Sequence, residues 1–308
     1  MSLTLWVQLL VSGILLGGVY ALASIGLTLI FGVMKIVNFA HGEFLMLAMY
    51  VAFWLFHYLG LDPYASIVLT APILFLVGLA TYVLFIRRTL NTPILTQIFV
   101  TVGLSILIEN LALLFWSADF RTVSIDYLKH SLIIGPFPAL GLEEVMISPA
   151  RLIAFVLALS LGIGFYYFLK LSYTGKVIRA TSQDRWAALL MGINIDKVFK
   201  LAFSIGILLV GVAGALMIPI YTVHPFVGFE FVLVMFVIVV LGGMGSIVGA
   251  MIAGIVIGIV EVFSGYLIGP DSKQAVYFLL FIAVLVFRPS GLFGLEREEE
   301  LERIEAMD

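Results

Sequence analysis

The stretch MKIVNFAHGEF, residues 34–44, concentrates side chains that can exchange protons or hydrogen bonds between two long apolar runs. They are Lys35, Asn38, His41 and Glu43. Polar groups inside a membrane are costly unless they meet a partner, a cavity or the interface. One interpretation is that Lys35 and Asn38 anchor two span ends at the interface. The other is a broken-helix entry at which Asn38, His41 and Glu43 brace a gate or contact a solute.

Helical spacing through this stretch would place four residues on one face and Glu43 on another. The four are Asn38, His41, Gly42 and Leu45. Glu109 is a further ionisable residue deep in an apolar run, where a structural hydrogen bond between helices is favoured over a solute contact. Together, His41, Glu43 and Glu109 would also suit proton carriage in a stand-alone secondary transporter or channel.

Constellations that indicate an enzyme are missing from the sequence. The apolar runs contain no histidine pair at i, i+4 with a glutamate base, no Gly-x-Ser-x-Gly elbow and no carboxylate pair at catalytic spacing. Cysteine is absent, which excludes disulfides and cysteine-ligated metal. No segment follows the phosphate-binding pattern G-x-x-x-x-G-K-[ST], which excludes ATP binding in the P-loop manner. We therefore expect no catalytic residues, no metal and no cofactor.

The composition indicates an integral membrane protein. Of 308 residues, 63% are hydrophobic and 11% are charged, whereas soluble domains carry about a quarter charged residues. The mean hydropathy is +1.20. Long apolar runs without polar alternation predict an all-α, polytopic transmembrane helical bundle in a lipid bilayer, and nothing indicates nucleic-acid binding. The first run lacks the features of a cleaved signal peptide and is expected to remain a span.

The runs between polar or Gly/Pro breaks predict nine or ten spans. The first run is either one tilted helix or two half-length pieces parted at Gly17-Gly18. The spans are expected near residues 5–34, 41–59, 63–86, 94–116, 149–170, 199–221, a broken pair within 229–264, and 275–287.

The segment LGGMGSIVGA, residues 241–250, is a second irregularity inside an apolar stretch. Its glycines are Gly242, Gly243, Gly245 and Gly249. Glycines at this density allow close helix packing or a break in the backbone. Non-helical backbone at membrane depth is tolerated only where it is sheltered by protein or where it lines a water-filled path. The alternatives are small-residue helix packing and a re-entrant turn beside a translocation route.

Basic residues are divided unequally between the two sides of the predicted bundle. If the loop Lys170–Lys200 is cytoplasmic, twelve of the sixteen Lys and Arg residues lie on that side and four on the other. The positive-inside rule then places the C-terminus in the cytoplasm, and the N-terminus outside if the span count is odd. Residues 117–148 form an external loop, and residues 291–308 form an acidic, solvated cytoplasmic tail.

The loop SYTGKVIRATSQDRWAALLMGINIDKVFKLAF, residues 172–203, contains a predicted short amphipathic helix. Thr181 or Ser182 is the candidate N-cap, and Asp184 would lie in the first turn, where the helix dipole favours an anion. Apolar residues then recur at helical spacing, namely Trp186, Leu189, Leu190 and Ile193. Gly192 supplies a stop signal.

This loop is longer than a bare connector requires. One interpretation is a helix lying on lipid headgroups, with Lys176, Arg179 and Arg185 toward the phosphates. The other is a docking knob for a cytoplasmic partner. The segment alone leaves both open.

Three stretches of the chain stand out together. They are GVYALASIGLTLIFGVMKIVNFAHGEFLMLAMYVAF (18–53), TGKVIRATSQDRWAALLMGIN (174–194) and FVIVVLGGMGSIVGAMIAGIVIGIVE (236–261). They resemble the permease subunit of branched-chain amino acid ABC importers, in particular the shorter, LivH-type permease. The resemblance covers essentially the whole chain. Urea and short-chain amide importers use similar permeases, and these solutes stay alternatives.

The resemblance implies a single permease domain over residues 1–290 in the bacterial plasma (inner) membrane, with residues 171–198 as its cytoplasmic coupling loop. Such a permease moves a small amino acid by alternating access. The implied partners are a homologous second permease subunit, two cytoplasmic ATP-binding subunits that bind the ATP, and an external solute-binding protein.

The loop is also similar to the coupling segment of ABC permeases, whose frequent pattern is Glu-Ala-Ala, three residues, then Gly. Ala187, Ala188 and Gly192 keep that spacing, whereas Trp186 stands in place of the glutamate. The similarity favours docking over lipid contact. The predicted ATPase-coupling residues are Arg179, Arg185, Trp186, Ala187, Ala188 and Gly192. The predicted gate and path residues are Asn38, His41, Gly42, Glu43, Gly242, Gly243 and Gly245.

Overall fold

A computed structural model describes residues 3–136, 143–288 and 290–294 of the chain. Seven helices in this part are long and apolar enough to cross a bilayer, and two further apolar helices are shorter. Apolar runs form helices because backbone groups inside a bilayer have to bond within their own segment. The predicted all-α, multi-pass fold is confirmed.

The described part of the chain contains nine apolar helices, of which α10 and α12 are the two shorter ones, and its first run is one unbroken helix. In chain order they are α1 (Leu3–Met34), α2 (His41–Leu59), α3 (Ile67–Thr81), α5 (Ile94–Trp116), α6 (Pro149–Leu171), α9 (Ile195–Met217), α10 (Val227–Gly242), α11 (Ile247–Leu267) and α12 (Lys273–Phe287). A π-helical turn, η1 (Tyr82–Ile86), joins α3 to α4 (Arg87–Thr89).

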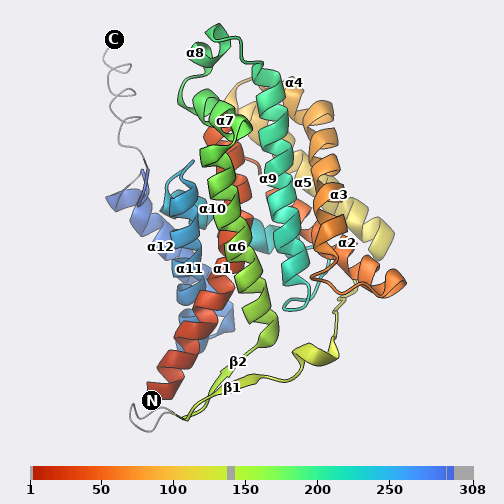
Figure 1. The fold of residues 1–308 in the computed structure, drawn as a ribbon, viewed down its shortest axis with the longest axis vertical. Coiled ribbons are helices and arrows are strands. Elements are labelled where there is room, and N and C mark those ends of the chain that lie inside the picture. Colours follow the sequence, from red (N-terminus) through yellow and green to blue (C-terminus); the bar gives the residue numbers. More distant parts are fainter. Residues whose placement is uncertain (1–2, 137–142, 289, 295–308) are drawn as a thin grey trace.

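The elements outside the spans gather at opposite ends of the bundle (Figure 1). At one end are α7 (Tyr173–Gln183) and α8 (Arg185–Leu190). At the other, near the start of α1, β1 (Leu132–Ile134) pairs antiparallel with β2 (Val145–Ile147). Single 3₁₀ turns are η2 (Asp126–Leu128) and η4 (Pro270–Ser272). Most of the predicted tail 291–308, and positions 137–142 of the predicted external loop, lie outside the described residues.

Helix α1 lies at the centre of the bundle, where α11, α9 and α6 surround it. Glycines set the closeness of this packing: a Cβ added at Gly17 would lie 2.6 Å from the Ile255 Cα, and one at Gly206 would lie 2.7 Å from the Gly26 carbonyl oxygen. Small residues let membrane helices approach to backbone contact. Gly17-Gly18 therefore serves helix packing and does not part α1 into two pieces.

The glycine-rich segment breaks the backbone between α10 and α11. Gly243 and Gly245 both have φ of +94°, a region that favours glycine, and the Ser246 hydroxyl accepts a hydrogen bond from the Gly249 N–H at 3.1 Å. The turn lies beside Gly32, two residues before the end of α1. The broken pair is confirmed, and the turn between its two helices lies at the end of the bundle that carries α7. That this turn lies beside a translocation route stays a prediction.

The predicted cap of the loop helix is also wrong. Thr181 and Ser182 lie inside α7, and their hydroxyls donate to the carbonyls of Val177 and Arg179. Asp184 is the N-cap of α8, because its carboxylate accepts from the N–H groups of Trp186 and Ala187 at 2.8 and 2.9 Å. Helix α7, which the sequence analysis left out, is capped by Ser172.

Candidate translocation site and coupling helix

The polar stretch 35–40 turns back into the bundle. Lys35 has φ of +58°, and the five residues after it are not helical. Helix α2 starts at His41, whose Nε2 donates to the Ala23 carbonyl at 3.2 Å. Because Ala23 lies eleven residues before the end of α1, α2 begins about 16 Å below that end, at 1.5 Å per residue. The chain therefore enters α2 from inside the bundle.

This geometry bears on the interpretation that Lys35 and Asn38 anchor two span ends. Asn38 and His41 are fully buried and Glu43 is 1% exposed, so Asn38 lies inside the bundle and does not anchor a span end at the interface. Lys35 is exposed, as an interfacial residue would be. Asn38 precedes the helix, so its predicted place on a stripe with Gly42 is wrong.

The first turns of α2 and α10 meet in the interior. A Cβ added at Gly42 would lie 2.8 Å from the Val232 Cβ, and one at Gly228 would lie 2.6 Å from the Glu43 Cδ. The Ser105 hydroxyl of α5 donates to Glu43 Oε1 at 3.2 Å. Four helices, α1, α2, α5 and α10, thus converge on one polar junction. We call Asn38, His41, Gly42, Glu43, Ser105 and Gly228 the α2–α10 junction.

Several polar atoms of the junction make no hydrogen bond within the described part of the chain. They are both side-chain amide atoms of Asn38, Nδ1 of His41 and Oε2 of Glu43. A buried polar group without a partner costs about 1–3 kcal/mol, and such groups are rare in native structures. In transport proteins such groups mark solute or proton paths. The junction therefore contains polar atoms whose hydrogen-bond partners could come from a solute or from a rearranged helix.

The predicted glycines Gly242, Gly243 and Gly245 do not join this cluster. They form the α10–α11 turn near the end of α1, whereas the junction lies at the opposite end of α10. Gly228 and Ser105, in contrast, belong to the junction and escaped the sequence analysis. For Gly228 a signal was available in the sequence. HGEF at 41–44 and VGFEF at 227–231 both place a glycine shortly before a glutamate at the start of an apolar run.

Arg121 fastens the loop after α5 to the loop between α9 and α10. Its backbone exchanges two hydrogen bonds of 2.9 Å with Val223. Its guanidinium lies 4.9 Å from the Trp54 ring centroid and 5.7 Å from that of Phe53, and donates to the Trp116 carbonyl at 2.8 Å. This contact ties α2, α5 and α10 together beyond the junction.

Helix α8 forms a protruding knob at the end of the molecule (Figure 1). Trp186 is 72% exposed, Leu190 88% and Met191 82%. Gly192, with φ of +82°, ends the helix in open space. Large apolar side chains this exposed typically mark contact with a partner or a membrane.

The other predicted coupling residues lie differently. Ala187 is exposed beside Trp186, whereas Ala188 faces inward and is buried. The Arg185 guanidinium lies 5.5 Å from the Phe199 ring centroid in α9. Arg179 belongs to α7 and donates to the Lys170 carbonyl at 3.3 Å, so it lies apart from the knob.

Nine apolar helices around a buried polar junction, with a knob at one end, indicate a multi-pass membrane protein. The family model for the permease component of branched-chain amino acid transport systems matches residues 9–285, and the chain belongs to this family. It is therefore a transport subunit and not an enzyme.

Curated relatives match along nearly the full length. The permease protein BraD of Pseudomonas aeruginosa, named as part of a high-affinity branched-chain amino acid transport system, is 32% identical, with 96% of this chain and 98% of the relative covered. The LivH permease of Escherichia coli K12, named in the same way, is also 32% identical over the same shares. A probable LivH permease of Methanocaldococcus jannaschii is 26% identical, over 94% of this chain and 93% of the relative. No solved structure matches significantly.

Proposed function

We propose that this chain is the LivH-type permease subunit of an ATP-driven, high-affinity importer of branched-chain amino acids. The observation that carries the proposal is the identity of 32% over 96% of the chain to relatives named for that transport. The chain would form half of the translocation pathway, with a homologous second permease forming the other half. An external solute-binding protein would deliver the amino acid.

ATP hydrolysis would come from two cytoplasmic partner subunits, because this sequence contains no P-loop. The apolar knob supports their docking at α8, since aromatic and aliphatic side chains that fill a partner's pocket dominate interface energies. The charge asymmetry of the loops supports a cytoplasmic position for α7, α8 and the C-terminus in the bacterial plasma membrane.

The α2–α10 junction is the proposed gate. In the described conformation α2 and α10 are in backbone contact there and the polar groups of Asn38, His41 and Glu43 are sealed from solvent. Movement of α8 by the ATPase would tilt the spans, part the two helix starts and expose these groups to the solute. Such a cycle shifts populations between outward-open and inward-open states without a chemical step on the solute.

The test is reconstitution into liposomes. Vesicles with this chain, the second permease, both ATPase subunits and the binding protein should accumulate radiolabelled leucine only with ATP inside. Vesicles with this chain alone should take up none under a proton or sodium gradient. Gradient-driven leucine uptake by the chain alone would refute the proposal. If the complete assembly accumulates urea or a short-chain amide and not leucine, the importer class stands and the solute assignment is wrong.

A further inference from the structure

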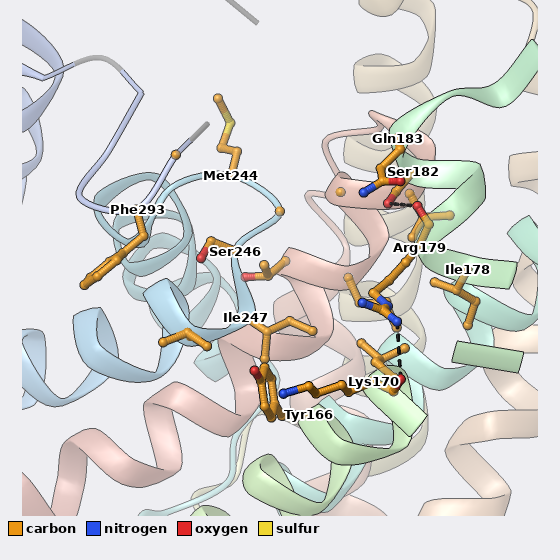
Figure 2. A pocket seen from close by; sticks show the side chains of 18 of the residues that line it. Tyr166, Lys170, Ile178, Arg179, Ser182, Gln183, Met244, Ser246, Ile247 and Phe293 are labelled. Carbon is orange, nitrogen blue, oxygen red and sulfur yellow. Dashed lines mark hydrogen bonds between the residues drawn. The ribbon is translucent and has the colours of Figure 1, made fainter. Parts of the chain in front are cut away.

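A pocket of about 800 Å³ opens beside the α7 end of the bundle. Its walls come from the last turns of α1 and α6, from α7, from the α10–α11 turn and from the segment after α12 (Figure 2). It lies at the level where α1 and α6 end, which is the depth of lipid headgroups in a spanning protein. The pocket is separate from the α2–α10 junction, and no residue of the junction lines it.

The polar wall of the pocket carries only positive charge. Lys35, Lys170 and Arg179 line it, and no Asp or Glu does so among the described residues. Arg179 is held in place by its hydrogen bond to the Lys170 carbonyl, and the Lys170 ammonium lies 5.9 Å from the Tyr166 ring centroid. Figure 2 shows Lys170 and Arg179 on one side of the opening, with Ser182 and Gln183 above them. These groups suit the recognition of a phosphate.

The opposite wall is apolar and leads to the membrane. Met244, Ile247 and Phe293 form it, across the opening from Arg179 in Figure 2. Val248 also lines the pocket, and it is exposed together with Ile252 one turn further along α11. The pocket therefore joins a cationic site to a hydrophobic surface on the outside of α11. The start of α11 at Ser246 adds the positive end of a helix dipole to the same wall.

We propose that this pocket binds the headgroup of an anionic phospholipid, with the acyl chains lying along the outer face of α11. Basic pockets between membrane helices recognise such headgroups. A free phosphate ion would use the cationic wall but would leave the apolar wall without a function. The acidic residues that follow Gly294 in the sequence are the alternative occupant. The continuity of the apolar wall with exposed α11 favours lipid. This proposal does not depend on the identity of the transported solute.

The experiment measures lipid binding to the purified full-length chain in neutral detergent by native mass spectrometry and by thermal unfolding. Phosphatidylglycerol should bind and raise the melting temperature, and phosphatidylethanolamine should bind more weakly. The double variant Lys170→Gln/Arg179→Gln should bind phosphatidylglycerol roughly thirtyfold more weakly, because each basic group near a membrane surface contributes about a fivefold factor. The single variant Lys170→Gln should show roughly a fivefold loss and replaces the double variant if the latter is unstable.

The matched control is Lys176→Gln/Lys197→Gln, which removes two exposed charges from the same end of the molecule outside the pocket. Its affinity for phosphatidylglycerol should stay within about twofold of the native chain. Three results would overturn the proposal: equal losses in the two double variants, equal stabilisation by inorganic phosphate, or severalfold tighter lipid binding once residues 295–308 are deleted. The last result would assign the pocket to the acidic segment.

Discussion

The carboxyl group of Glu43, in the first turn of α2, lies against Gly228 in the first turn of α10, so that a Cβ at position 228 would lie 2.6 Å from the Glu43 Cδ. These two residues are 185 positions apart in the sequence, yet their helices start side by side inside the bundle. The proposed gate would open where these two helix starts separate, and the Glu43 side chain is the group that lies between them. Substitutions at the junction should therefore report on both packing and transport.

Gly42→Ala should damage the junction. The added methyl group would lie 2.8 Å from the Gly228 carbonyl carbon and 2.8 Å from the Val232 Cβ, where the α10 backbone cannot turn aside, and such overpacking costs about 1–3 kcal/mol. We expect a lower melting temperature in detergent and loss of ATP-driven leucine uptake. The control is Gly103→Ala in α5, where nothing lies within 4 Å of the new Cβ; its stability should be unchanged or higher. Equal melting temperatures for the two variants would show that the contact does not constrain the helices.

Asn38→Leu should separate stability from function. The buried amide of Asn38 makes no hydrogen bond within the described residues, so an apolar side chain of similar size should leave stability unchanged or raise it by about 1 kcal/mol. Leucine uptake should nevertheless fall at least about tenfold if the amide contacts the solute or the opened gate.

The matched control for Asn38 is Thr101→Val in α5, which removes a buried hydroxyl that lies 3.0 Å from the Ile98 carbonyl oxygen of its own helix and 3.2 Å from the carbonyl oxygen of Val37, the residue before Asn38. This change should cost about 1 kcal/mol of stability. A clear destabilisation by Asn38→Leu, with uptake retained, would assign the amide a structural role and contradict the gate.

Leu190→Arg should prevent assembly with the ATPase subunits while membrane insertion stays normal. Leu190 is 88% exposed on the knob, so the change costs the isolated chain little, whereas a charge in the centre of an apolar interface typically costs 2 kcal/mol or more. Co-purification of the ATPase subunits reports the effect. Tyr173→Arg, at an 82% exposed position at the start of α7, is the control and should assemble normally. If both variants assemble, the ATPases dock elsewhere.

Arg121→Gln should loosen the link between the loops at the other end of the junction. The guanidinium contacts the rings of Phe53 and Trp54 and the Trp116 carbonyl, and its loss should lower stability by about 1–3 kcal/mol. Thermal unfolding followed by tryptophan fluorescence measures the change. The control Lys129→Gln breaks an exposed ion pair with Asp126 in the same loop and should have no measurable effect. If Arg121→Gln melts at the same temperature as the native chain, the Arg121 side chain does not stabilise the link between these loops.

The spans and their boundaries follow closely from the sequence, because a bilayer leaves an apolar run few alternatives to a helix. The break at Gly243 and Gly245 was also predictable, since two glycines at positive φ end a helix. The position of this break along the bundle was not predictable. It depends on how α10 lies against α1, which is set by backbone contacts between residues far apart in the chain, such as that between Gly32 and Gly245.

The candidate site was predictable only in its α2 half. His41 and Glu43 stood out as polar residues between apolar runs, whereas Ser105 is an ordinary residue of another span and Gly228 is signalled only by the glutamate two residues after it. Asp184 as a helix cap was misplaced by a few residues because Thr181, Ser182 and Asp184 are all good caps, and α7 contains too few apolar residues to stand out. That the ATPase subunits dock at α8, and that α8 lies on the cytoplasmic side of the membrane, stay predictions.

The glycine contacts between α1 and α11 bear on how such a protein can change shape. A Cβ at Gly254 would lie 2.6 Å from the Ala21 Cα, and one at Gly258 would lie 2.5 Å from the Gly17 Cα, so these two backbones touch over several turns with no side chains between them that could change rotamer. Any hinge therefore has to lie outside this pair. During transport α1 and α11 would move as one unit, and the other helices would move relative to them.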